Sequence, residues 1–122
     1  MQRYPNPLLI VIDAYAAMLS AWLGVAMVLA AVVDVLLDAR GSLFYAFLAL
    51  AVFAGLGHVG FAFAHKCPEC GKHPTIQGFA PPHASAAHDG DGAWARVVRD
   101  VIHKRSFTCF HCGSSFDVSD AA

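Results

Sequence analysis

The sequence predicts a membrane α-helical hairpin of two transmembrane helices, followed by a small C-terminal β domain that is built around four cysteines and carries an inserted amphipathic helix. Two long apolar runs and two copies of the pattern Cys-x-x-Cys-Gly support this prediction. Only 14% of the 122 residues are charged, whereas soluble domains carry about 25% charged residues. The deficit lies in the first half, where the formal charges between Leu8 and Ala64 are Asp13, Asp34, Asp38 and Arg40.

The predicted hairpin occupies residues 1–64, with spans at about residues 10–34 and 43–64. Residues 14–33 carry no charge, and a helix of about twenty apolar residues crosses the roughly 30 Å of hydrocarbon in a bilayer. His58 is the one ionisable residue of the second span. The stretch DVLLDARGS between the spans has the charges and the glycine of a tight turn.

Two alternatives to a membrane-spanning helix are disfavoured for the first apolar run. A cleaved signal peptide has a basic start and a short apolar core, whereas this chain begins with one arginine and two prolines and continues with a longer run. A buried hairpin in a soluble protein needs a second layer to cover it, and the remaining residues are too few to form one. Insertion into a membrane is therefore the favoured interpretation.

Positive charges flank the two spans unevenly. Arg3 precedes the first span, Arg40 lies in the turn beside acidic residues, and six Lys or Arg residues follow the second span. Positively charged flanks remain on the cytoplasmic side, so we expect an integral protein of a bacterial inner membrane with both termini in the cytoplasm. The cysteines would then face a reducing compartment, which favours metal-binding thiolates over disulfides.

Small residues suggest how the two spans meet, because helices in lipid associate through close backbone approach. An antiparallel turn near Arg40 would place Gly24 against Gly55, Ser20 against His58 or Gly57, and Asp13 near Lys66. The same residues would equally serve as a dimerisation face. We expect His58 to be a neutral imidazole bonded to Ser20 or to a backbone carbonyl, since one histidine makes a poor proton path. The predicted helix-packing residues are Ser20, Gly24, Gly55, Gly57 and His58.

The four cysteines form two pairs with the spacing of metal ligands. A structural zinc ion takes four tetrahedral ligands, often four thiolates. Each Cys-x-x-Cys turn presents two sulfurs on one side of a tight loop, and the glycine that follows permits a left-handed backbone conformation. The predicted ligands are Cys67, Cys70, Cys109 and Cys112, with Gly71 and Gly113 as the following glycines. The same four ligands would also hold iron.

These motifs resemble those of the zinc-ribbon group, whose fold is similar to that of the rubredoxins. The matching residues are Cys67, Pro68, Cys70 and Gly71, then Cys109, Cys112 and Gly113. The resemblance implies a domain at residues 65–122 with two metal-binding turns on short β-hairpins, for which PTIQGF, SFTC and SSFDVS would supply strands. The sequence departs from the usual ribbon spacing, because 38 residues separate Cys70 from Cys109 where about 15 to 20 are usual.

The insertion between the two turns has two predicted parts. Residues 78–92 are rich in Pro, Ala and Gly and are expected to form a flexible loop. Residues 93–104 show apolar side chains at helical spacing and a basic face, which predicts an amphipathic helix. This helix would either cover the small domain or lie on the lipid surface. We expect His65 and His111 to face solvent, since four cysteines leave the metal no need of them.

The favoured function is that of a small membrane protein whose cytoplasmic zinc ribbon is an interaction or adaptor module for another membrane or cytoplasmic protein. A membrane-tethered, rubredoxin-like iron electron carrier is the alternative. A membrane-held nucleic-acid-binding ribbon is disfavoured, because the segment from His65 onward has six basic and six acidic residues. We expect no enzymatic activity, since no catalytic constellation is evident. Self-association is left open.

Overall fold

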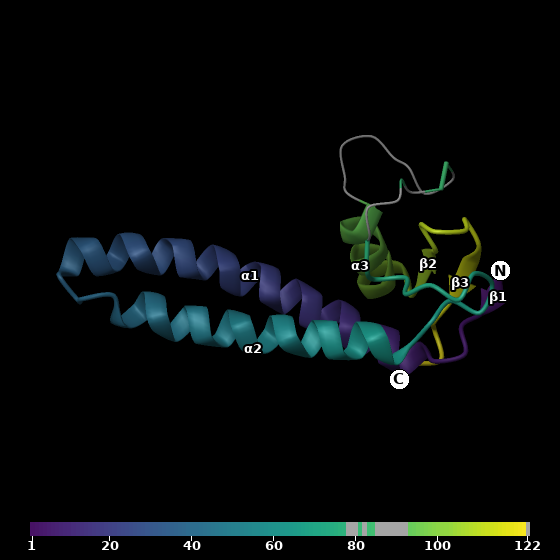
Figure 1. Ribbon diagram of the computed structural model, residues 1–122, viewed down its shortest axis with the longest axis horizontal. Helices are drawn as coiled ribbons and strands as arrows, with labels where there is room; N and C mark the ends of the chain where they lie inside the picture. The colour runs from purple at the N-terminus through teal and green to yellow at the C-terminus, as the bar shows by residue number, and fades with distance from the viewer. Residues whose placement is uncertain (78–80, 82, 85–92, 122) are drawn as a thin grey trace.

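The computed structural model describes residues 1–77, 81, 83–84 and 93–121. The described part contains three helices and three short strands (Figure 1). In chain order these are β1 (Gln2–Arg3), α1 (Pro7–Leu37), α2 (Ser42–Ala64), α3 (Ala93–Lys104), β2 (Ser106–Thr108) and β3 (Ser115–Asp117). Most of the predicted flexible loop, residues 78–92, lies outside the described residues.

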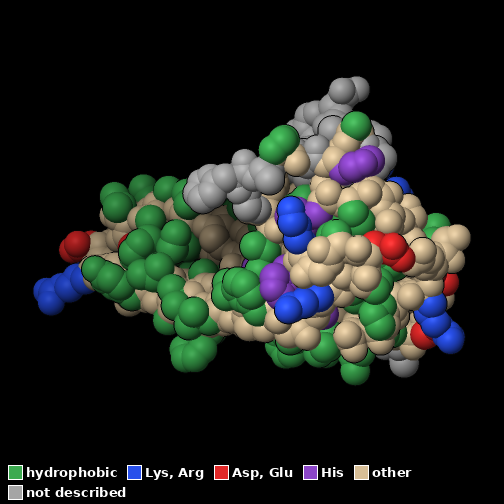
Figure 2. Space-filling model, turned by 45° about the vertical axis from the view of Figure 1, so that its right-hand side comes forward, with side chains coloured by type: hydrophobic (Ala, Val, Ile, Leu, Met, Phe, Trp, Pro, Cys, Tyr) green, Lys and Arg blue, Asp and Glu red, His purple; other side chains and the backbone are tan. Residues whose placement is uncertain are grey.

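Helices α1 and α2 lie side by side as a long antiparallel hairpin, and both are long and apolar enough to cross a membrane (Figure 1). Their apolar side chains point mostly outward, and Ala62 is the one buried residue of α2. Hydrophobic side chains dominate the visible surface of the hairpin, whereas charged side chains lie at its tip and both charged and histidine side chains lie at the opposite end (Figure 2).

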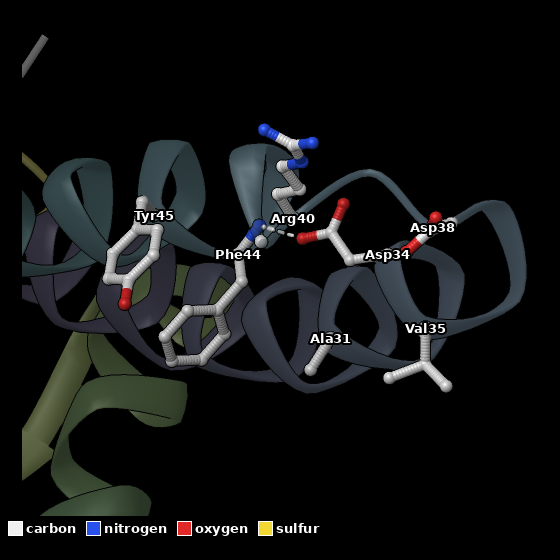
Figure 3. A pocket seen from close by; sticks show the side chains of 8 residues that line it. Ala31, Asp34, Val35, Asp38, Arg40, Phe44 and Tyr45 are labelled. Atoms are coloured by element: carbon white, nitrogen blue, oxygen red, sulfur yellow. Dashed lines mark hydrogen bonds between the residues drawn. The ribbon is translucent and has the colours of Figure 1, made fainter.

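The turn of the hairpin is held by a carboxylate from α1. Asp34, which is 5% exposed, accepts a hydrogen bond from the backbone N–H of Phe44 at 2.8 Å (Figure 3) and another from that of Leu43 at 3.3 Å. The first amides of a helix have no intrahelical acceptor, so Asp34 acts as the N-terminal cap of α2. A pocket of about 550 Å³ opens beside this turn and includes Asp38 and Arg40 in its lining.

Helix α1 is longer than a bilayer requires. Its 31 residues span about 46 Å, compared with roughly 30 Å of hydrocarbon. Five of its seven buried residues lie in its first eleven positions, where they contact the rest of the protein. These residues are Ile10, Val11, Asp13, Ala14 and Ala17. The first turns of α1 therefore belong to the packed end of the molecule.

The contacts between α1 and α2 differ in detail from the predicted pairing. The Oγ atom of Ser20 lies 3.4 Å from the position that a Cβ on Gly55 would occupy, so Ser20 rather than Gly24 lies against Gly55. A Cβ on Gly24 or Gly57 would have no neighbour within 4 Å. His58 is bonded to Asp13 instead of Ser20. Among the glycines predicted to pack, Gly55 is therefore the one that faces a side chain of the other helix, that of Ser20.

The remaining elements form a small unit that we call the cysteine domain, comprising β1 with the described residues from 65 onward. Its sheet has the order β1-β3-β2, with β3 parallel to β1 and antiparallel to β2. The third strand thus comes from the N-terminus, which the sequence had assigned to the hairpin. The expected strand in PTIQGF is not formed by its described residues 74–77, which adopt a turn and irregular backbone.

Aromatic rings fill the core beneath this sheet. Tyr4, Phe107 and Phe116 are buried and pack edge-on or tilted, with ring centroids 5.3 to 5.6 Å apart. Helix α3 adds Val97, Val98 and Val101, all buried in the same core, and it contacts both β2 and α1. The structure thus shows this helix covering the domain with one face, as considered above, while its exposed face stays available.

We expect Asp34→Ala to lower the free energy of unfolding of the hairpin by about 1 kcal/mol, the usual cost of losing an N-terminal cap. Denaturant titration in detergent micelles would measure this change. Asp34→Asn retains one acceptor oxygen and should lose less, whereas Asp38→Asn removes a charge from the same turn and should have little effect. Equal losses for Asp34→Asn and Asp34→Ala would assign the role of Asp34 to its charge rather than to capping.

Candidate metal centre

The structure brings the four predicted cysteine ligands together. Their sulfur atoms all lie within 4.8 Å of one another, and the four cysteines are free rather than joined as disulfides. The Sγ atoms of Cys67 and Cys112 are 3.7 Å apart, and those of Cys70 and Cys109 are 3.9 Å apart. A tetrahedral ion with metal–sulfur bonds of about 2.3 Å requires sulfur–sulfur separations of about 3.8 Å. The cluster therefore has the dimensions of a site for one tetrahedral ion.

Each pair of cysteines sits in a turn with the same hydrogen bonds. The N–H of Cys67 donates to the Lys72 carbonyl and the N–H of Gly71 donates to the Cys67 carbonyl, at 2.8 and 2.9 Å. In the second turn the N–H of Cys109 donates to the Ser114 carbonyl and the N–H of Gly113 donates back to the Cys109 carbonyl, both at 2.8 Å.

The glycine of each turn has a positive φ angle, 70° at Gly71 and 80° at Gly113. This conformation is strained for residues that have a Cβ atom, which explains why a glycine follows each pair. Backbone amides in each turn also point at the first sulfur, those of Glu69 and Cys70 at Cys67 and those of His111 and Cys112 at Cys109. The turns thus offer the sulfurs donors that would stabilise thiolates.

Burial and hydrogen bonding act in opposite directions on these thiols. Burial raises the pKa of Cys67 and of Cys109, because the charged thiolate is poorly solvated there. Burial also acts on Cys112, but hydrogen bonds from Ser114 and the neighbouring thiols outweigh it and lower the pKa of Cys112 to about 7. In the absence of an ion, Cys67 and Cys109 therefore keep their protons at neutral pH.

Histidines join the two cysteine turns without taking part in the sulfur cluster. The Nε2 atom of His111 lies 3.2 Å from the His73 carbonyl oxygen and 3.0 Å from that of Ile76, so its N–H donates to the segment after the first turn. The Nδ1 of His73 lies 2.8 Å from the His65 carbonyl oxygen. The prediction that His111 faces solvent is therefore wrong, because its ring is half-buried and its hydrogen bonds connect the second turn to the segment after the first.

No family model, no curated protein and no solved structure matches this chain. Within the described residues, the geometry assigns the chain a cluster of four cysteines arranged to hold a metal ion, next to two helices that are long and apolar enough to span a membrane.

A second polar cluster, which the sequence did not predict, joins the cysteine domain to both long helices. Its centre is the carboxylate of Asp13, which is fully buried. One oxygen lies 2.5 Å from Nδ1 of His58 in α2, and the other lies 3.0 Å from Nε2 of His65 and also accepts from the Thr75 hydroxyl. We call Asp13, His58, His65 and Thr75 the Asp13 cluster.

Tyr4 and Trp94 extend the Asp13 cluster on its two sides. The Tyr4 hydroxyl lies 2.8 Å from Nδ1 of His65 and donates to the Lys66 carbonyl at 3.0 Å. Burial raises the pKa of Tyr4, so the hydroxyl keeps the proton that it donates. The Trp94 ring of α3 packs edge-on against His58, with centroids 5.7 Å apart.

These contacts correct two expectations. Asp13 does lie where the chain leaves α2, but its partner there is the side chain of His65, the residue before Lys66, and His65 is 1% exposed instead of facing solvent. His58 bonds a carboxylate rather than Ser20 or a carbonyl. One feature of the sequence could have predicted this cluster. Asp13 and His58 are isolated ionisable residues in long apolar stretches, and a carboxylate buried there requires hydrogen-bonding partners.

We expect metal affinity to fall steeply as the pH is lowered, because four-sulfur coordination requires thiolates and must displace protons from Cys67 and Cys109. Two displaced protons correspond to at least about a hundredfold loss of affinity per pH unit. Competition against a chelator at several pH values, corrected for the protonation of the chelator, would measure this slope. An affinity independent of pH would mean that the thiolates exist before the ion binds.

We expect Asp13→Asn to destabilise the protein by about 3 kcal/mol, because it breaks a buried charged network that joins three elements. Denaturant unfolding in micelles, followed by tryptophan fluorescence, would measure the loss. Asp120→Asn is the control: Asp120 pairs with Arg3 and both side chains are exposed, and pairs of this kind contribute less than about 1 kcal/mol. Equal effects of the two changes would contradict a structural role for the Asp13 cluster.

Proposed function

We propose that this chain is a small integral membrane protein of a bacterial inner membrane, with a cytoplasmic zinc ribbon that serves as an interaction or adaptor module. The observation that carries the proposal is the continuous set of contacts from the cysteine turns to the two apolar helices. His65 lies two residues before Cys67 and bonds Asp13 of α1, and Asp13 bonds His58 of α2. The ribbon is therefore built onto the helix pair rather than tethered to it by a linker.

The outward-facing apolar side chains of the hairpin support membrane insertion. Leu29, Leu36 and Phe53 are more than 60% exposed, as are several other large apolar residues of the two helices. Soluble monomers rarely expose apolar patches of this extent, whereas hydrocarbon solvates them. Both chain ends lie at the cysteine-domain end of the hairpin (Figure 1). With the positive charges that follow α2, this arrangement supports a cytoplasmic location for the domain.

A structural role for the metal is supported by its ligands and by the size of the domain. Four sulfurs fill a tetrahedral shell and leave no open position for a substrate or water, so we propose no catalysis at the ion. The three strands have only two or three residues each. A sheet this small depends on other stabilisation, and bound metal supplies folding energy directly.

The surface of the cysteine domain would then present a fixed docking face beneath the bilayer for another membrane or cytoplasmic protein. A domain bonded to both spans holds one orientation to the membrane, so a partner meets a preset geometry and loses less entropy on binding. Such a role requires the ion only to keep the domain folded.

One observation supports the alternative of an iron electron carrier. Cys70 and Cys112 are partly exposed, whereas Cys67 and Cys109 are buried, so one side of the cluster is accessible for electron exchange. The same four thiolates hold either metal, and a rubredoxin-like iron site would change oxidation state without changing its ligands.

Elemental analysis of protein purified from membranes without added metal would decide between these functions. We expect one zinc ion per chain, in protein that stays in the membrane fraction after alkaline carbonate washing. Cys109→Ser should lose the ion and make the cysteine domain sensitive to protease, while the hairpin stays inserted. Ser119→Ala, on the exposed side of the same domain, should retain both metal and protease resistance. Iron with visible absorption that bleaches on reduction would replace the adaptor function by electron transfer.

A further inference from the structure

A groove of about 270 Å³ runs between α1 and α3, on the outside of the hairpin. Its lining combines an apolar floor with a basic edge. The apolar residues include Met18, Trp22, Trp94 and Val98, and the basic edge consists of Arg99 and His103. The chain has two tryptophans, and both line this groove.

The length of α1 places the groove at the boundary of the bilayer that is proposed above. About twenty residues cross the hydrocarbon, so a span that is counted back from Leu37 ends near Met18. Trp22 lies one turn further in and is 65% exposed. Tryptophan is enriched at this depth, where its ring contacts both acyl chains and headgroups. The groove therefore opens where a phospholipid has its headgroup and the first part of its tails.

The basic edge has the hydrogen-bond donors and the spacing of a phosphate site. Arg99 and His103 are four residues apart in α3, so they lie on the same face of the helix, and both are exposed. Two further cations of α3 lie elsewhere on the helix. Arg96 and Lys104 pair with Asp100, at 3.5 and 3.1 Å, and neither lines the groove.

We propose that this groove binds one anionic phospholipid, with its phosphate at Arg99 and His103 and the start of an acyl chain against Met18 and Trp22. The inference rests on the proposed membrane location. The basic edge complements an anionic headgroup, and the apolar floor continues the lipid-facing surface of α1. A bound lipid would contact α1 and α3 together and would fix the height of the cysteine domain above the membrane.

Tryptophan fluorescence tests this site directly, because both indoles line the groove. Protein in phosphatidylcholine nanodiscs would receive a minor fraction of phosphatidylglycerol with brominated acyl chains, which quench nearby indoles. We expect stronger quenching than the same fraction of brominated phosphatidylcholine produces. Arg99→Gln should weaken the apparent affinity for phosphatidylglycerol about fivefold, the effect of one interfacial cation. Lys104→Gln removes the same charge from the same helix outside the groove and should change the affinity by less than about twofold.

A second measurement covers the apolar floor. Native mass spectrometry of protein released from the nanodiscs would count retained phosphatidylglycerol, and Trp22→Ala should lose the lipid that the parent chain retains. Leu29→Ala, an exposed position of α1 beyond the groove, should retain it. Metal content would verify that each variant is folded.

The outcomes separate this site from the membrane proposal. Two results, in protein that is inserted and metal-loaded, would overturn the lipid site alone. One is equal quenching by the two brominated lipids, and the other is an equal loss of affinity for phosphatidylglycerol in Arg99→Gln and Lys104→Gln. A chain that remains soluble without detergent and does not enter the nanodiscs would overturn the membrane location together with the lipid site.

Discussion

The buried carboxylate of Asp13 is the interaction on which the arrangement of the molecule depends. It accepts hydrogen bonds from His58 in α2 and from His65 and Thr75 in the cysteine domain, so three separate parts of the chain meet at one charged group. A carboxylate without partners at this depth would be costly, and each bond therefore restrains the element that supplies it. The hairpin and the cysteine domain consequently have one relative position instead of a range of positions.

The cysteine turns and the Asp13 cluster depend on each other through short stretches of chain. His65 precedes the first metal turn by two residues, and its neighbour in the core, Tyr4, continues β1 by donating its backbone N–H to Asp117. An ion bound at the sulfurs fixes the backbone that holds His65, and His65 fixes Asp13. A metal bound at the four cysteines would therefore stabilise the junction with the helices as well as the cysteine domain.

Much of this structure could be predicted from local sequence patterns. Charge-free runs of the required length predict α1 and α2, spacing within each motif predicts the cysteine turns, and apolar periodicity predicts α3. The Asp13 cluster could not be predicted in this way, because its bonds join residues 45 to 62 positions apart. Strand β1 is two residues long, too short for any pattern. His65 is buried and His111 half-buried, and both bond to distant parts of the chain, which composition does not reveal.

The parallel pairing of β1 with β3 has a consequence for biosynthesis. β1 precedes both long helices and β3 follows them, so the sheet cannot close while the ribosome is still making the hairpin. Both long helices must therefore be made before the two distant strands can pair. Closure of the sheet beside the cysteine cluster is thereby one of the last steps in folding, and a chain truncated within α3 would lack the partner strand of β1.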